Sequence, residues 1–136
     1  MPDRQYIESV IGYHFVQPQL LDEALLAAGA SVARKNTHGP SEGNKRLALV
    51  GDAALQLAIL DDEGSRLVKS FASNNKLRDV AKERGVHDHI TKNPAQEGEA
   101  PRATLASTIE AVIGAVWVDS KKDIGTVQTV VKNLSL

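Results

Sequence analysis

The sequence has no cysteine among its 136 residues. Disulfide bonds and thiolate metal sites are therefore excluded, and a reducing environment fits this composition. The sequence also has no apolar run near the ~18 residues that cross a membrane, and its start does not have the form of a secretory signal. We therefore expect an intracellular protein that makes no use of a membrane, in a compartment that the sequence does not specify.

An excess of positive charge is missing too, because 16 Lys and Arg face 17 Asp and Glu and give a formal net charge of −1. A strongly basic chain would have indicated nucleic-acid binding, whereas here only a local basic cluster could serve that purpose. The candidates for contacts with RNA phosphates are Arg34, Lys35, Lys45 and Arg46. The same residues are equally typical of a solvated surface, and their spacing leaves both interpretations open.

Hydrophobic residues make up 42% of the chain, which is enough for one core in a single domain over residues 1–136. Apolar residues recur at helical spacing, and no segment shows the clean alternation of a strand. The sequence therefore predicts an all-α fold. The expected helices cover residues 5–15, 16–28, 44–60, 67–71, 75–84, 103–120 and a less regular tail at 122–136.

Proline, glycine and asparagine mark where these helices begin and end. Pro18 falls near the start of the second helix, where a missing N–H costs least. Asn75 is expected to be the N-cap of a helix that Gly85 ends. Residues 31–43 and 87–102 are polar and irregular, so both are predicted to be loops.

Two of the most apolar segments each contain a single acidic residue, Asp52 and Glu110. Burying a carboxylate is costly unless something pairs with it. Central helices of a small bundle usually touch, so the two acids could converge on a hard cation such as Mg²⁺. The alternative is an ordinary ion pair, for example with Lys45, two turns before Asp52. Spacing alone favours the ion pair, because such pairs are common.

Two blocks of the sequence resemble the endonuclease domain of the ribonuclease III family, an all-helical unit that cuts double-stranded RNA. The family signature reads approximately N-E-R-L-E-F-L-G-D-A, and residues 44–53 read NKRLALVGDA. A second family block reads approximately L-A-D-x-F-E-A-x-I-G-A-x-Y-L-D, and residues 105–119 read LASTIEAVIGAVWVD. The resemblance extends along nearly the whole chain in the family's order.

The resemblance implies a catalytic Mg²⁺ held by four acids, of which this chain retains Asp52 and Glu110. Ala48 and Ser107 stand at the other two positions, and Lys45 replaces the first Glu of the signature. Fewer carboxylates hold a cation less firmly, and phosphodiester hydrolysis depends on that ion to stabilise developing charge. The expected cofactor is Mg²⁺ or Mn²⁺ at Asp52 and Glu110 if the protein is active, and none otherwise.

The resemblance also implies a homodimer that pairs through the signature helix, with Leu49 at the position of a family Phe that inserts into its partner. No double-stranded-RNA-binding domain is expected after Asp119. We therefore expect a degenerate family member that acts as a dimeric RNA-binding or assembly protein. Two alternatives remain: an unconventional endonuclease using Asp52 and Glu110 with a divalent metal, and a heterodimer module that binds no RNA. The sequence does not show whether Glu42 or Asp62 replaces a lost ligand.

Overall fold

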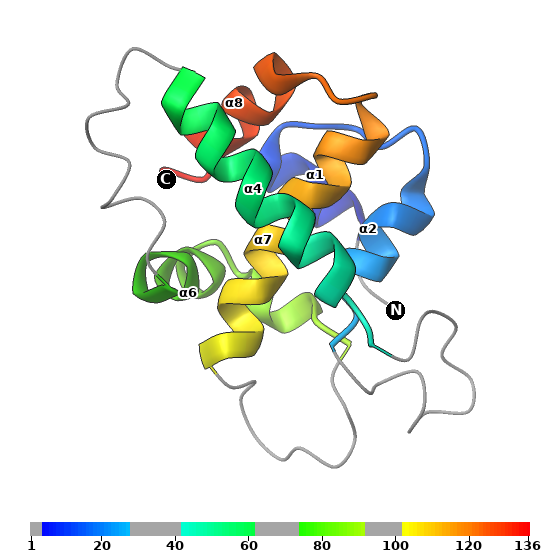
Figure 1. The fold of residues 1–136 in the computed structure, drawn as a ribbon. Coiled ribbons are helices and arrows are strands. Elements are labelled where there is room, and N and C mark those ends of the chain that lie inside the picture. The colour runs from blue at the N-terminus through cyan, green and yellow to red at the C-terminus, as the bar shows by residue number, and fades with distance from the viewer. Residues whose placement is uncertain (1–3, 28–41, 62–73, 92–101) are drawn as a thin grey trace.

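The structure, a computed structural model, describes residues 4–27, 42–61, 74–91 and 102–136. Over these ranges the chain forms helices and no strand, which confirms the predicted all-α fold (Figure 1). One isolated bridge joins Leu26 to Thr91. The helices are α1 (Arg4–Ile11), α2 (Pro18–Ala24), α4 (Lys45–Asp61), α6 (Asn74–Glu83), the 3₁₀ helix η2 (Val86–His89), α7 (Arg102–Asp119) and α8 (Ile124–Asn133).

Helices α4 and α7 form the centre of the fold, and the other helices pack around them (Figure 1). Gly51 and Gly114 mark the point where the two central helices cross. A Cβ atom on Gly51 would lie 1.5 Å from the carbonyl oxygen of Glu110, and one on Gly114 would lie 2.2 Å from that of Leu47. No other residue type leaves room for this approach, so the two glycines set how closely the helices pack.

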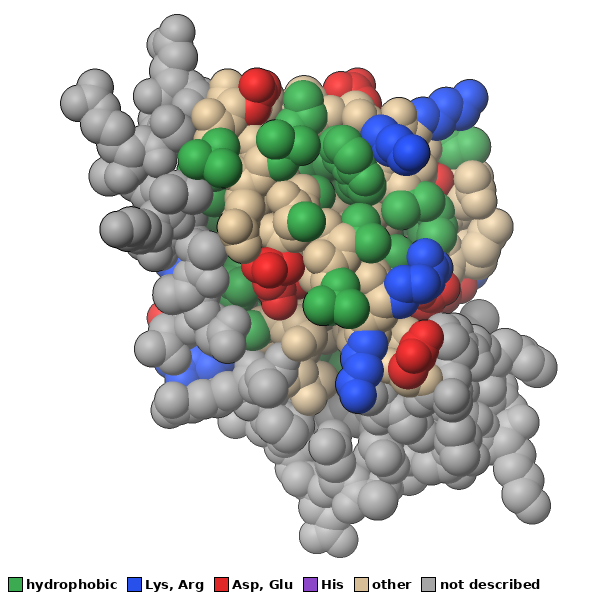
Figure 2. All heavy atoms as spheres, viewed as in Figure 1, with side chains coloured by type: hydrophobic (Ala, Val, Ile, Leu, Met, Phe, Trp, Pro, Cys, Tyr) green, Lys and Arg blue, Asp and Glu red, His purple; other side chains and the backbone are tan. Residues whose placement is uncertain are grey.

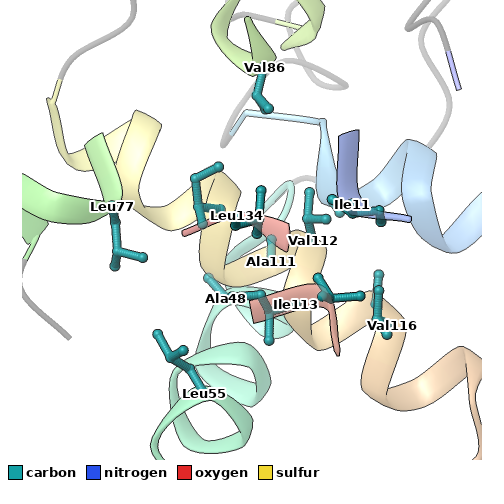
Figure 3. Close-up of a cluster of buried hydrophobic side chains, with 14 of the residues drawn as sticks. Ile11, Ala48, Leu55, Leu77, Val86, Ala111, Val112, Ile113, Val116 and Leu134 are labelled. Atoms are coloured by element: carbon teal, nitrogen blue, oxygen red, sulfur yellow. The ribbon is translucent and has the colours of Figure 1, made fainter. Parts of the chain in front are cut away.

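The core consists of side chains from every described helix, with α7 buried over most of its length (Figure 3). The largest side chains that are fully buried are Phe15, Ile7, Ile11, Leu21, Leu25, Leu47, Leu55, Leu77, Leu105, Ile109, Ile113 and Leu134. Helix α4 buries only one face, and Leu49, Leu57 and Leu60 on its other side are exposed. Within the described ranges, no helix has the length and hydropathy of a membrane span.

Asp119 ties the end of α7 to the segment between α1 and α2. Its carboxylate is 6% exposed and accepts hydrogen bonds from the Tyr13 hydroxyl (2.7 Å) and from the backbone amides of Val16 (2.9 Å) and Gln17 (2.7 Å). Burial alone would raise the pKa of Asp119, but these hydrogen bonds outweigh it and hold the pKa below its usual value.

Several predicted helix ends need correction. Pro18 begins α2 as expected, after the N-cap Gln17. The first helix, however, ends at Ile11, because Gly12 adopts a left-handed conformation (φ 71°). Phe15 is buried from the segment beyond that helix, where its backbone amide donates to Glu8.

The C-terminal half differs at two helix ends from the sequence expectation. Asn75 is not an N-cap, because α6 already begins at Asn74. Gly85 lies just after α6 in a left-handed conformation, but η2 follows it where a loop was predicted. The tail is helical as expected, since Asp123 caps α8 by accepting from the amide of Gly125 (3.0 Å). The expected helix at 67–71 and most of the predicted loops lie outside the described residues.

Candidate functional site

The crossing of α4 and α7 brings Asp52 and Glu110 together. Their carboxyl groups lie within hydrogen-bonding reach, and both side chains are half-buried. The Gln56 amide, one turn further along α4, donates to Asp52 Oδ1 at 3.3 Å. In Figure 2 acidic side chains stand among the hydrophobic ones on the face that α4 presents. Asp52 therefore faces another acid, which comes from a different helix.

At neutral pH the two carboxyl groups of Asp52 and Glu110 together hold one proton. Burial, together with the hydrogen bond to Asp52 and its negative charge, raises the pKa of Glu110 to about 8. Two carboxylates at close range cannot both ionise cheaply, so one of them keeps its proton. A protonated Glu110 carboxyl can donate a hydrogen bond to Asp52.

Lys45 does not perform this neutralisation in the structure. Its side chain is exposed at the start of α4, and among the described residues no ion pair joins it to Asp52. The two residues are two turns apart on α4, and Asp52 faces Glu110 across the helix crossing. The ion-pair interpretation of Asp52 is therefore replaced by a pair of carboxyl groups.

Ala48 and Ser107 lie one turn before the two acids on their respective helices, on the same faces. Ala48 belongs to the buried hydrophobic cluster, as Figure 3 shows, and its methyl group can bind no cation. Ser107 is partly buried and offers a neutral hydroxyl. In the part of the chain that is described, no three His, Cys, Asp or Glu side chains gather at one place. This donor set does not fit the four-acid magnesium site that the family resemblance implies.

The predicted basic cluster is only partly visible. Arg46 forms an ion pair with Glu23 of α2 at 3.1 Å, and Lys45 beside it extends into solvent. Arg34 and Lys35 lie outside the described residues, so their position relative to α4 stays a prediction. Glu42 is exposed just before α4, and Asp62 is not among the described residues.

Sequence reasoning missed the residues that hold the crossing in place. Asn44, immediately before α4, is buried, and its amide donates to the Ala24 carbonyl (2.8 Å) and to the Thr108 hydroxyl (3.2 Å). Thr108 in turn donates to the Thr104 carbonyl at 2.7 Å. These bonds join α2, α4 and α7 beside the acid pair. A signal was present, because Asn44 opens the signature block.

No protein-family model matches the chain. Curated relatives named Ribonuclease 3 do match it. The one from Shewanella loihica is 31% identical over 138 residues, which cover 91% of this chain and 56% of the relative. The one from Geobacter metallireducens is 31% identical over 140 residues, covering 93% and 56%. The chain thus spans a little over half the length of these relatives.

The fold is shared with the nuclease domain of ribonuclease III from Campylobacter jejuni. One structure of that domain has a TM-score of 0.78 at 22% identity and covers 98% of this chain and 94% of the domain. A second, described for structural flexibility in a region involved in dimer formation, has a TM-score of 0.77 at 23% identity and covers 97% and 95%. With sequence similarity along nearly its whole length and this shared fold, the chain belongs to the ribonuclease III family and corresponds to its nuclease domain.

Proposed function

We propose that this protein is a catalytically impaired ribonuclease III domain that acts as a dimeric RNA-binding or assembly protein. The observation that carries the proposal is the pairing of Asp52 with Glu110 at the α4–α7 crossing, where Ala48 and Ser107 occupy the other two family acid positions. The two remaining acids satisfy each other with a shared proton instead of presenting a strongly negative site.

The chemistry of phosphodiester hydrolysis explains why this loss matters. In the family, bound Mg²⁺ supplies a nucleophilic water and stabilises charge on the phosphate. Magnesium prefers several oxygen ligands in near-octahedral geometry and gives up its water reluctantly. A cation at this site would have two carboxylates, a hydroxyl and a methyl group around it, in place of four carboxylates. Weak cation binding and no detectable cleavage are the expected result.

The outer face of α4 supports the dimeric part of the proposal. Leu49 is 76% exposed and Leu57 is 48% exposed, on a helix whose opposite face forms the core. Apolar side chains gathered in this way typically mark a protein interface. Lys45 extends from the start of the same helix and is available for a phosphate, whereas Arg46 is held by Glu23.

A cleavage assay on long double-stranded RNA tests the proposal, with Mg²⁺ and Mn²⁺ supplied separately. Glu110→Gln, purified identically, reveals any contaminating nuclease. We expect no cleavage by either protein. Cleavage by the wild type that disappears in Glu110→Gln would overturn the proposal in favour of an unconventional metal-dependent nuclease. Retention of the same duplex in a gel-shift assay separates an RNA-binding role from a pure protein-interaction role.

A further inference from the structure

Asn44, the residue immediately before α4, is buried where α2, α4 and α7 meet. It is 4% exposed, and its amide nitrogen donates to the Ala24 carbonyl at the end of α2 (2.8 Å) and to the Thr108 hydroxyl in α7 (3.2 Å). An asparagine just before a helix typically accepts from the first amides of that helix. The Asn44 amide donates to two other elements, so it ties the start of α4 to both of them.

The roles of donor and acceptor in the Asn44–Thr108 bond are fixed. Thr108 is fully buried, and its hydroxyl donates to the Thr104 carbonyl, one turn earlier on α7, at 2.7 Å. A hydroxyl has one proton to donate, so towards Asn44 it acts as an acceptor. The Asn44 amide is thus held at one point of α7, and the bond has a defined length and direction.

Helices α4 and α7 cross like the two strokes of an X, and their N-terminal halves lie on the same side of the crossing (Figure 1). The helices approach most closely at Gly51 of α4 and Gly114 of α7. Asn44 and Thr108 both precede these glycines along their segments. Their hydrogen bond therefore spans the opening between the two N-terminal halves.

The acid pair lies in the neighbouring opening of the same crossing. Asp52 directly follows Gly51 on α4, and Glu110 precedes Gly114 on α7 by one turn, so the pair joins the C-terminal half of α4 to the N-terminal half of α7. Two rods that touch at one point can still pivot, and a pivot that widens one opening narrows the openings beside it. A change in the span of the Asn44 bond is therefore transmitted to the distance between the two carboxyl groups.

We propose that Asn44 is a positioning residue, whose bond to Thr108 fixes the angle between α4 and α7 and thereby sets the separation of the Asp52 and Glu110 carboxyl groups. The glycine contact sets how closely the helices approach, and the Asn44 bond sets how they are turned. This role concerns the geometry of the crossing and holds whether or not the site is active. In a site that cleaves RNA, a misplacement of about 1 Å can cost about 100-fold in rate.

Substitutions at Thr108 test this role with little change in side-chain volume. Thr108→Val keeps the shape and removes the acceptor, whereas Thr108→Ser keeps the hydroxyl, and Asn44→Ala removes the bond from the other side. The orientation of α4 relative to α7 is measured in each full-length variant from residual dipolar couplings of the backbone amides. We expect Thr108→Val and Asn44→Ala to turn α4 against α7, and Thr108→Ser to retain the wild-type orientation. Val86→Ala, at a buried position of η2 outside both helices, is the control for lost packing and should also retain it.

Kinetics in the double variant Ala48→Glu with Ser107→Asp, in which all four family acids are present, measure the consequence for chemistry. This part of the test rests on the proposed function. Adding Thr108→Val is expected to lower kcat about tenfold or more with little change in KM, and adding Thr108→Ser is expected to retain kcat.

The outcomes separate the positioning role from the proposed function. An unchanged helix orientation in Thr108→Val and Asn44→Ala, or an equal turn in Val86→Ala, would overturn the role of Asn44. A turned α4 with an unchanged kcat would show that the angle does not set the separation of the acids, which also overturns it. A double variant that cleaves no RNA would count against the proposed function, and the dipolar couplings would still decide whether Asn44 fixes the crossing.

Discussion

Asp52 and Glu110 meet where the two central helices cross, and their pairing explains how acids are kept in such apolar segments. A half-buried carboxyl group next to another can keep its proton, which removes both the repulsion and most of the desolvation cost. Burial and Asp52 raise the pKa of Glu110 to about 8, so this state persists at neutral pH. A site that bound a cation strongly would require the opposite, with both groups ionised.

The Glu110 proton makes stability depend on pH. The folded-state pKa of about 8 exceeds the ordinary value of 4.5, so the folded protein holds the proton more tightly. The stabilisation is complete below about pH 4.5 and is lost as pH rises toward 8. Glu110→Gln keeps a neutral hydrogen-bond donor, so we expect it to exceed the wild type by about 1–2 kcal/mol at pH 8 and to match it near pH 4, allowing for solvent screening.

Urea unfolding at several pH values measures this difference. Glu83→Gln, at an exposed carboxyl on α6, is the matched control and should follow the wild type throughout. Parallel stability curves for wild type and Glu110→Gln from pH 4 to pH 8 would contradict the shared-proton account.

The pKa of Asp119 is shifted downward, in the opposite direction to that of Glu110. Its pKa is held below the usual range by hydrogen bonds that outweigh burial, so its contribution is present above the ordinary carboxyl pKa and is lost as pH falls through the folded value. Asp119→Asn removes the charge and turns an amide donor toward backbone N–H groups. We expect a loss of about 2 kcal/mol at pH 7 in urea unfolding, and a smaller difference near pH 3. Asp79→Asn on α6 should cost little, and an equal loss in both variants would argue against the anchoring role.

At the scale of helices, hydrophobic spacing predicted α4 and α7 well because both contain long apolar runs. Because central helices usually touch, the sequence also indicates that Asp52 and Glu110 could converge, and in the structure they do. Spacing did not reveal that the contact goes through Gly51 and Gly114, since a glycine within an apolar helix has the same local signal wherever its partner lies. Spacing also did not show whether Asp52 faces Glu110 or Lys45. Periodicity reports which face is buried and not what lies opposite it.

Helix ends were less predictable for a similar reason. Asn75 has the chemistry of an N-cap, yet α6 already begins at Asn74. Phe15 continues the apolar spacing of α1 although Gly12 has already ended the helix. The backbone conformation of Gly12, and not the apolar spacing, decides where α1 ends.

The glycine crossing has a direct consequence for stability. In Gly51→Ala the new Cβ atom would lie 1.5 Å from the Glu110 carbonyl oxygen, so the helices must separate. We expect a loss of about 3 kcal/mol or more in urea unfolding. Gly125→Ala in α8 is the matched control, because its Cβ meets only the Asp123 carboxylate oxygen at 3.3 Å. A Gly51→Ala variant as stable as this control would show that the helices do not depend on the close approach.

At the scale of the whole molecule, the fold and the catalytic acids are separable. The crossing is held by two glycines, by the Asn44–Thr108 hydrogen bond and by the buried hydrophobic cluster, none of which needs a carboxylate at position 48 or 107. This chain therefore keeps the family's architecture with Ala48 and Ser107 at two positions where the resemblance implies acids.

Restoring the missing acids tests the central claim most directly. Ala48→Glu combined with Ser107→Asp rebuilds the four-acid set, and its cleavage of long double-stranded RNA with Mg²⁺ is compared with that of the wild type. We predict cleavage by the restored variant, none by the wild type, and loss of the restored activity when Glu110→Gln is added. Wild-type cleavage as fast as that of the restored variant, or a folded and dimeric restored variant that stays silent, would contradict the claim that the two missing acids abolish catalysis.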